Sequence, residues 1–156
     1  MTKHDVTVST YHELLKPAFI ALNRQWIEYY FKLEPMDLQQ LENPQKTILE
    51  SGGEIFFILE DKRPVGTVAM IPIGDGSYEL AKMAVEPGNQ GKGYGDLLMK
   101  AAVEWAKLKK AKEIILISNQ KLIPALSLYR KFGFKVVSLA QHPDYQRGNI
   151  EMKLTL

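Results

Sequence analysis

A short glycine-rich segment has the clearest chemical character in this sequence. Gln90-Gly91-Lys92-Gly93-Tyr94-Gly95 lies between an apolar strand pattern, Ser77–Val85, and an amphipathic helix pattern that begins at Asp96. Glycines let the backbone take positive φ angles and approach a ligand closely. The first N–H groups of a helix have no partner within the helix, and the helix dipole adds positive potential there. With the charge of Lys92, these features predict an anion site suited to a pyrophosphate.

Two common phosphate-binding motifs do not fit this segment. A P-loop requires GxxxxGK[ST], and here Lys92 is followed by Gly93. A dinucleotide fingerprint that starts at Gly91 needs a third glycine where Asp96 stands. The surrounding strand patterns also follow one another as an antiparallel meander and not as βαβ units. A dinucleotide-dependent enzyme is therefore a poor fit, and a glycine-rich turn without a ligand remains an alternative.

The residues in and after this segment resemble the GCN5-related N-acetyltransferase (GNAT) family, in particular its small, single-domain bacterial members. Gln90-x-x-Gly93-x-Gly95 is similar to the family's acetyl-CoA signature, which reads Gln or Arg, two residues, Gly, one residue, then Gly or Ala. A second signature follows in four pieces: Ser118-Asn119, Pro124-Ala125, Leu128–Phe134 and the ending Tyr145–Met152. The order and spacing of the pieces carry the resemblance, which extends from about Glu54 to Leu156.

The resemblance implies an α/β (mixed α+β) fold with a mostly antiparallel, V-splayed sheet flanked by helices and acetyl-CoA in the splay. Backbone N–H groups of Met83, Ala84 and Val85 would then hold the pantetheine and the thioester carbonyl. An N–H aimed at that carbonyl stabilises the oxyanion, an effect worth about 3–4 kcal/mol in other acyl-transfer enzymes. The other implied cofactor-binding residues are Gln90, Gly91, Lys92, Gly93, Tyr94, Gly95, Asp96, Asn119, Ala125 and Tyr129.

The strand before the glycine-rich segment contains a conflict in its alternation. Strict alternation places Lys82 on the same face as the apolar Leu80 and Ala84. A β-bulge would resolve the conflict, and bulges are frequent beside active sites. We therefore expect a bulge in this strand.

The resemblance also implies two catalytic roles. The acceptor amine must be neutral to attack, and a lysine-like amine with a pKa of ~10.4 is rarely neutral at pH 7. Glu79 is the candidate general base, acting directly or through water. Tyr129 is the candidate general acid, because a phenol can hydrogen-bond the departing sulfur and give it a proton. The alternatives are a salt-bridged or solvated carboxylate for Glu79 and a packed aromatic for Tyr129.

Asn119 has a positional argument of its own. Proline is tolerated only in the first turn of a helix, so Pro124 prevents the following helix from beginning as early as Gln120. Asn119 therefore lies in the loop before that helix, and the resemblance implies that it meets the pantetheine. The alternative is a turn asparagine that bonds its own backbone. Arg130 and Lys131 are expected to be solvated helix charges.

The acceptor side is less well determined. The resemblance puts Tyr30 and Phe31 in one wall of an acceptor groove and Arg147 in the other, with Glu79 between them. Arg147 could clamp a substrate carboxylate with two hydrogen bonds, which would favour an amino-acid-like acceptor. The alternatives are core aromatics and a surface arginine.

The function that the resemblance implies is direct transfer of acetyl from acetyl-CoA to the primary amine of a small molecule or amino acid, in a ternary complex. A catalytically silent CoA-binding sensor module and an acetyltransferase for protein or peptide amines are the alternatives.

Apolar strand patterns alternate with longer helical patterns, which predicts one mixed α/β domain over residues 1–156. Helices are expected at Tyr11–Phe31, Pro35–Leu41, Asp96–Lys110 and Ile123–Phe132. Strands are expected at Asp5–Ser9, Glu54–Glu60, Val65–Ile73, Ser77–Val85, Glu113–Ile117, Lys135–Leu139 and Ile150–Leu154. The run Glu113–Ile117 is wholly apolar after its first residue, which predicts burial on both faces.

Composition excludes several other classes of protein. The 156 residues carry a net charge of +2, too balanced for a nucleic-acid binder, and no apolar run is long enough to span a membrane. There is no cysteine, and His4, His12 and His142 are scattered, so no metal site is expected. The polar N-terminus lacks a signal-peptide core, which makes the cytoplasm the default compartment. Edge strands near the C-terminus leave room for a homodimer.

Overall fold

Tight turns build the antiparallel half of the sheet. In the computed structural model, which describes residues 5–156, β2 (Glu54–Glu60) and β3 (Arg63–Gly74) are joined through Asp61 and Lys62. Both of these turn residues have positive φ angles, as the two-residue hairpin turns that match strand twist require. Gly74, Asp75 and Gly76 also have positive φ angles and turn the chain into β4 (Ser77–Val85). The expected meander is therefore confirmed.

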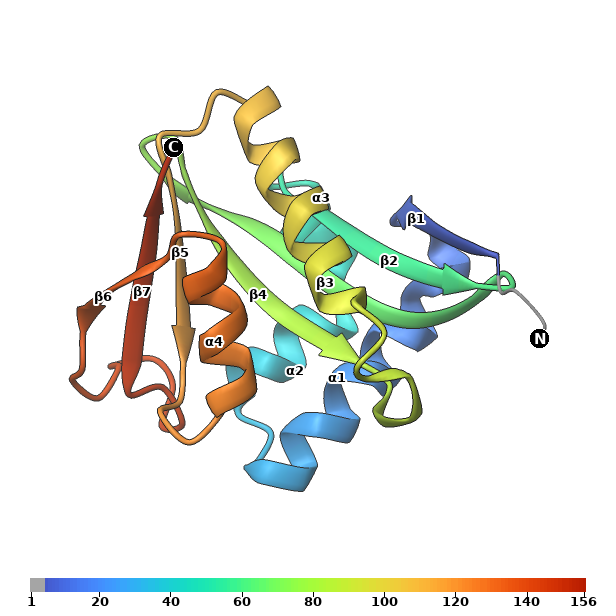
Figure 1. Ribbon diagram of the computed structural model, residues 1–156, viewed down its shortest axis with the longest axis horizontal. Helices are drawn as coiled ribbons and strands as arrows, with labels where there is room; N and C mark the ends of the chain where they lie inside the picture. Colours follow the sequence, from blue (N-terminus) through green and yellow to red (C-terminus); the bar gives the residue numbers. More distant parts are fainter. Residues whose placement is uncertain (1–4) are drawn as a thin grey trace.

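The sheet has seven strands in the order β1-β2-β3-β4-β5-β7-β6 (Figure 1). The remaining strands are β1 (Val6–Thr10), β5 (Glu113–Ser118), β6 (Lys135–Ser138) and β7 (Ile150–Thr155). The α-helices are α1 (Lys16–Tyr30), α2 (Pro35–Glu42), α3 (Tyr94–Leu108) and α4 (Ile123–Lys131). The predicted mixed α/β fold is confirmed, and His4 lies outside the described residues.

The two central strands pair only at one end. β4 and β5 are parallel neighbours over Ser77–Glu79 and Glu113–Ile115, and beyond these residues they diverge into a V (Figure 1). The predicted β-bulge occurs in β4, where the register with β3 shifts between Ala81 and Ala84 and Lys82 has a φ of +56°. Within residues 5–156, the rest of β4 has no strand partner on the β5 side.

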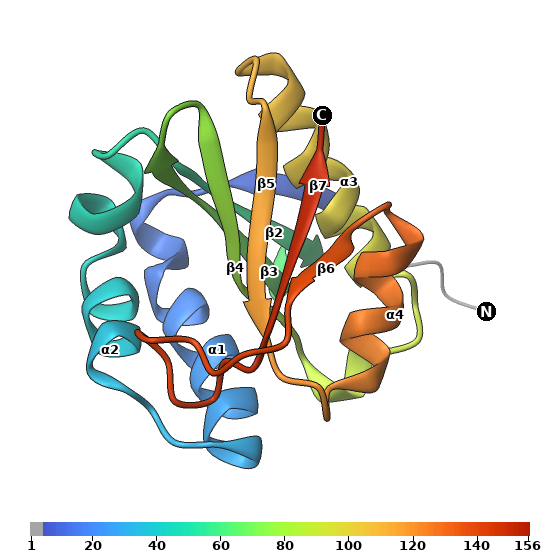
Figure 2. The ribbon, with the colours of Figure 1, turned by 90° about the vertical axis from the view of Figure 1, so that its left-hand side faces the viewer.

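The period-two pattern of the strands separates two hydrophobic cores. Phe56, Ile58, Val68 and Met70 face α3 and α4, together with Leu98 and Leu126. The alternate residues, Ile55, Phe57, Ala69 and Ile71, pack against Phe19 of α1 and Leu41 of α2. Helices α3 and α4 therefore cover one face of the sheet, and α1 and α2 cover the other (Figures 1 and 2).

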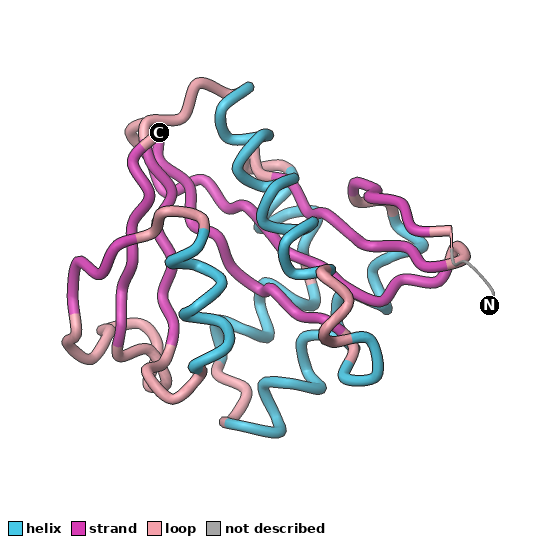
Figure 3. Tube along the Cα trace, in the orientation of Figure 1, coloured by secondary structure: helices cyan, strands magenta, loops and turns pink. Residues whose placement is uncertain are grey.

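Loops that follow three strands gather at the open end of the V. The connections after β4, β5 and β6 all lie there in the Cα trace (Figure 3). Helix α4 begins at Ile123 with Pro124 in its first turn, as expected, and Gly133 after its end has a φ of +98°. The V thus opens among segments that are free of sheet pairing.

Three local features differ from the sequence predictions. The segment expected to be one helix from Tyr11 begins instead as a 3-10 turn at Glu13–Leu15, and α1 starts at Lys16 with Pro17 in its first turn. A short π-helix, Gln45–Leu49, was not predicted, because five residues carry no readable periodicity. In β5 only Ile114 and Leu116 are fully buried, since the other face of the strand looks into a pocket.

Within residues 5–156, no helix is both long and apolar enough to cross a membrane.

Candidate active site

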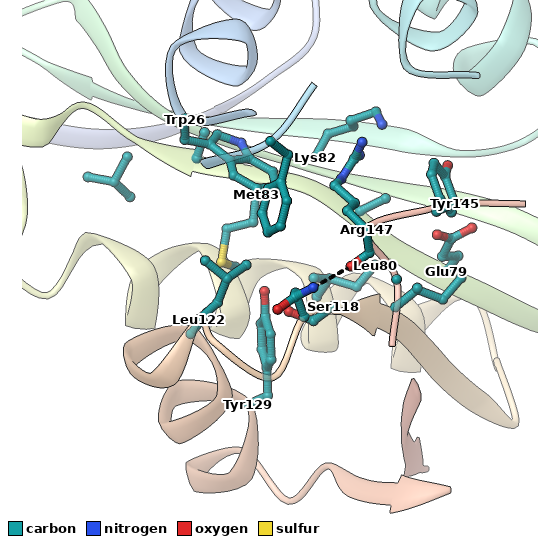
Figure 4. Close-up of a pocket in the computed structure, with 18 of the residues that line it drawn as sticks. Trp26, Glu79, Leu80, Lys82, Met83, Ser118, Leu122, Tyr129, Tyr145 and Arg147 are labelled. Carbon is teal, nitrogen blue, oxygen red and sulfur yellow. Dashed lines mark hydrogen bonds between the residues drawn. The ribbon is translucent and has the colours of Figure 1, made fainter. Parts of the chain in front are cut away.

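A pocket of about 200 Å³ lies in the V between β4 and β5 (Figure 4). Its walls come from the end of α1, from β4 beyond Tyr78, from Gln90, from the end of β5, from α4 and the residue before it, and from the segment before β7. The lining residues are Trp26, Phe31, Glu79, Leu80, Ala81, Lys82, Met83, Ala84, Val85, Gln90, Ile117, Ser118, Asn119, Leu122, Ala125, Tyr129, Tyr145, Arg147 and Gly148.

Tyr129 enters this pocket from α4. Its ring is buried against Phe134, with 6.2 Å between the ring centroids, and its hydroxyl points into the pocket (Figure 4). Burial raises the pKa of Tyr129 to about 12, so the phenol keeps its proton at neutral pH. The arrangement supplies a protonated hydrogen-bond donor opposite the unpaired part of β4.

Glu79 stands where β4 and β5 separate. Burial raises the pKa of its carboxyl group, the charge of Lys82 opposes this, and the charges of Asp144 and Glu151 add to it. A raised pKa makes a carboxylate a stronger proton acceptor than an exposed one. Glu79 and Tyr129 thus line one pocket from two different elements, β4 and α4.

The glycine-rich loop has the conformation that an anion site requires. Gly91 and Gly93 have φ angles of +82° and +81°, and among the described residues no atom outside their chain neighbours lies within 4 Å of where a Cβ atom would stand. Gly93 is the N-cap of α3, so the first N–H groups of that helix face the loop. Gln90 reaches the pocket and donates from Nε2 to the Val85 carbonyl oxygen at 3.5 Å. These features fit a pyrophosphate group between loop and helix.

The side chains of this loop are anchored by a carboxylate that the sequence analysis missed. Glu60, at the end of β2, accepts a hydrogen bond from the hydroxyl of Tyr94 and lies 3.3 Å from Lys92 Nζ. Lys92 also donates to Asn89 Oδ1 at 2.5 Å. The cation predicted to face the anion is therefore already held beside the loop.

The last two loop positions contact α4. A Cβ atom on Gly95 would meet Leu128 Cδ2 at 3.0 Å, so this glycine permits close packing of α3 against α4. Asp96 makes an ion pair with Lys131, which was expected to be solvated and is mostly exposed. Gly91 to Asp96 do not line the pocket themselves. They lie beside it, at the start of α3.

Asn119 lines the pocket, but its side chain is also part of the loop structure. Its Oδ1 accepts from the N–H of Lys121 at 3.0 Å, which is the turn arrangement given above as the alternative. Its Nδ2 donates to the Arg147 carbonyl oxygen at 2.8 Å (Figure 4). Asn119 thus ties the loop after β5 to the segment before β7.

A buried charge cluster closes the other end of the pocket. Asp37 is fully buried and holds both guanidinium nitrogens of Arg147, with Nη1–Oδ2 and Nη2–Oδ1 distances of 2.6 Å. It also accepts from Lys82 Nζ at 2.5 Å, and Glu34 lies 3.2 Å from Arg147 Nη1. Burial acts to raise the pKa of Asp37, but Arg147 and Lys82 outweigh it and lower the pKa to about 2. Asp37 therefore stays ionised between two cations.

Sequence reasoning missed Asp37, although one signal was available. Glu34 and Asp37 form a capping box around Pro35, in which each side chain bonds the other's backbone N–H. In a sequence, such a box indicates only the start of a helix. The second role of Asp37, as the ion-pair partner of Arg147, involves a residue that is remote in the sequence. Of the two predicted aromatic residues, Phe31 lines the pocket, whereas Tyr30 is half exposed and lies outside it.

Two comparisons place the chain among known sequences. The family model described as "Acetyltransferase (GNAT) domain" matches residues 51–136. An uncharacterized N-acetyltransferase of Bacillus subtilis, YobR, is 29% identical over 115 residues, which cover 72% of this chain and 46% of that protein. The chain thus spans about half the length of this relative.

Solved structures share the fold. A GNAT-family acetyltransferase of Staphylococcus aureus superposes with a TM-score of 0.89 at 22% identity, and the match covers 97% of this chain and 99% of that one. A spermidine N-acetyltransferase of Vibrio cholerae, in complex with CoA and spermine, superposes with a TM-score of 0.74 at 21% identity over 96% and 95% of the two chains. At such identities the likeness concerns the fold.

Proposed function

This chain belongs to the GNAT acetyltransferase family, and from this premise we propose that it transfers the acetyl group of acetyl-CoA to the primary amine of a small molecule. One observation carries the proposal: Glu79, the last β4 residue that pairs with β5, and Tyr129 of α4 line the same pocket. The loop Gln90–Gly95 and the start of α3 would hold the pyrophosphate of CoA. The complex of the Vibrio relative with CoA supports this ligand class.

In the proposed reaction, Glu79 accepts a proton from the acceptor ammonium, directly or through water. The freed amine nitrogen attacks the thioester carbonyl carbon, and backbone N–H groups of Met83, Ala84 and Val85 stabilise the resulting oxyanion. The C–S bond then breaks, CoA leaves as a thiolate, and the nitrogen of the new amide releases its extra proton to solvent. Tyr129 hydrogen-bonds the departing sulfur and gives it a proton, which solvent later replaces.

The raised pKa of Tyr129 qualifies its role. A phenol with a pKa of about 12 is a weaker acid than a thiol with a pKa of ~8.5, so full proton transfer to a solvated thiolate is unfavourable. Hydrogen-bond donation during C–S cleavage does not require full transfer. Inside the pocket, burial raises the pKa of the leaving thiol as well, so the difference between the pKa of this thiol and that of Tyr129 becomes smaller. Tyr129 therefore acts while the sulfur is still within the pocket.

Direct transfer in a ternary complex is favoured over an acyl-enzyme intermediate. The sequence contains no cysteine, and the amine of Lys82 within the pocket is bound to Asp37. Among the hydroxyl groups of the pocket lining, that of Tyr129 has a pKa too high to supply a phenolate at neutral pH. The acceptor amine is thus the nucleophile itself.

Thermal unfolding with acetyl-CoA, CoA and NAD in parallel tests the cofactor. A ligand at 100 times its dissociation constant adds about 2.7 kcal/mol to the free energy of unfolding. We expect a shift with both CoA species and none with NAD. A panel of amines then tests transfer through release of the CoA thiol. A CoA-induced shift without thiol release from any amine would favour the silent sensor module, and release only with proteins would favour a protein acetyltransferase.

A further inference from the structure

Both cations in the acceptor end of the pocket are already neutralised. Arg147 presents the planar fork that would hold a substrate carboxylate, but Asp37 occupies that fork with two bonds of 2.6 Å. Lys82 forms an ion pair with the same carboxylate, with 2.5 Å between Lys82 Nζ and Asp37 Oδ1, and its side chain is only 3% exposed. A carboxylate on the acceptor would therefore have to displace a fully buried internal partner from either cation.

The remaining charge in the pocket lining is negative. Of the lining residues, all of which belong to the described part of the chain, Glu79 is the charged one that takes part in no ion pair. Tyr145 lies beside it (Figure 4), and the aromatic side chains of Trp26 and Phe31 line the same pocket from the end of α1. A single carboxylate among aromatic surfaces is complementary to an ammonium on an apolar body, and it repels a second carboxylate.

The segment between β6 and β7 closes the acceptor end of the pocket, and contacts on both of its sides hold it in place. The chain between β6 and β7 runs from the sheet toward α2 (Figure 2). On the α2 side it is held by Arg147 on Asp37 and by the Gln146 N–H, which donates to Glu34 Oε1 at 2.9 Å. On the β5 side Asn119 and Ser118 hold it through hydrogen bonds to Arg147 and Asn149. The space behind this segment therefore admits a small body.

We infer that the acceptor of this enzyme is a small primary amine with an apolar or aromatic body and no carboxylate, and that Asp37 sets this preference by filling the fork of Arg147. The inference rests on the proposed acetyl transfer and narrows its acceptor. It replaces the expectation that Arg147 binds an amino-acid carboxylate, because the guanidinium contacts that such binding requires are made within the protein.

Matched substrates test the inference on the unmodified protein. CoA thiol release is measured with acetyl-CoA and phenethylamine, phenylalanine, phenylalaninamide or a lysine-containing peptide. We expect kcat/KM for phenethylamine to exceed that for phenylalanine at least about 100-fold, the scale on which an unpaired like charge is rejected. Phenylalaninamide, which keeps the skeleton without the charge, should fall within about tenfold of phenethylamine, and the peptide should not react.

The variant Asp37→Asn tests the residue that sets the preference. It weakens the internal partner of Arg147, so the ratio of kcat/KM between phenethylamine and phenylalanine should fall at least about tenfold. Glu28→Gln, which removes an exposed carboxylate paired with Arg24 on α1, is the matched control and should leave the ratio unchanged. A merely structural role of Asp37 would lower both rates and keep their ratio.

Each outcome has a distinct reading. Equal or faster turnover of phenylalanine, or of the peptide, by the unmodified protein overturns the inference but leaves acetyl transfer standing. No turnover of any amine overturns both. If Asp37→Asn folds and keeps the ratio of the unmodified protein, Asp37 does not set the preference. If Asp37→Asn does not fold, the matched substrates still decide the acceptor class.

Discussion

Asp37 and Arg147 lie 110 positions apart in the sequence, and their side chains form a bidentate ion pair that joins α2 to the segment before β7. The pair is buried at its carboxylate end and shares that carboxylate with Lys82 in the bulge of β4. One side chain thus ties α2 to β4 and to the segment before β7, both of which carry pocket residues. Changes at Asp37 therefore affect both stability and the acceptor end of the pocket.

Acid should weaken the fold through Asp37. Its pKa is about 2 in the folded state, below the ordinary value of 3.8, so the folded protein binds this proton less tightly than the unfolded chain. The stabilisation, about 2 kcal/mol by linkage, is fully present above about pH 4 and is lost as the pH falls toward 2. Urea unfolding of the unmodified protein and of Asp37→Asn from pH 5 to pH 2.5 measures it. A loss of the same size in both proteins would contradict the assignment.

Removing the hydroxyl of Tyr129 should separate chemistry from binding. In Tyr129→Phe the ring still packs against Phe134, so the fold and the dissociation constant for acetyl-CoA should change little. The turnover number should fall about 100-fold, the lower end of the range for general acid–base groups. Steady-state kinetics and calorimetric binding of acetyl-CoA test this. Unchanged turnover would remove Tyr129 from the mechanism.

Glu79 should produce a trade-off between activity and stability. Because burial raises its pKa, kcat/KM should decline on the acid side at a pH above 4.5, the ordinary pKa of this carboxyl group. Ionisation of Glu79 also costs folded-state stability, since the folded protein binds this proton more tightly than the unfolded chain. Glu79→Gln should therefore lose about 100-fold in activity, and its kcat/KM should no longer show this decline at low pH. The variant should nevertheless melt at a higher temperature than the unmodified protein at pH 7. A lower melting temperature would contradict the unfavourable burial of this charge.

The anchor of the glycine-rich loop should affect only substrates that carry a pyrophosphate. In Tyr94→Phe the bond to Glu60 is lost and the ring is kept. KM for acetyl-CoA should rise about three- to tenfold, consistent with losing one hydrogen bond to a charged group. KM for S-acetyl-pantetheine, which lacks the pyrophosphate, should not change. An equal rise for both substrates would indicate a general loss of structure.

Two glycines of the same motif should respond differently to alanine. Gly93 has a φ of +81° with open space before it, so Gly93→Ala strains the backbone by about 1–2 kcal/mol and distorts the loop. Gly95→Ala would crowd Leu128 instead. We expect the first variant to weaken acetyl-CoA binding more than the second at comparable melting temperatures. The reverse order would assign cofactor contact to Gly95.

Periodicity and turn chemistry were sufficient to predict most of the fold. The strands Glu54–Glu60 and Ser77–Val85 have the predicted bounds, because turn residues end each apolar run and the runs between the turns pack against helices. The bulge at Lys82 was predictable because a charged residue on an apolar face demands a break in register. The family motifs marked Gln90, Asn119 and Tyr129, which all line the pocket.

The sequence alone determined which local segments form and which residue types could carry acyl transfer, since both depend on neighbours along the chain. Tertiary structure decided the rest. The V arises because β4 and β5 pair at one end only, and the fork of Arg147 is filled by Asp37, which is remote in sequence. Lys92, expected at the anion site, is held by Glu60 for the same reason. The partner of a charged side chain is set by which elements the fold brings together, and no local pattern carries that information.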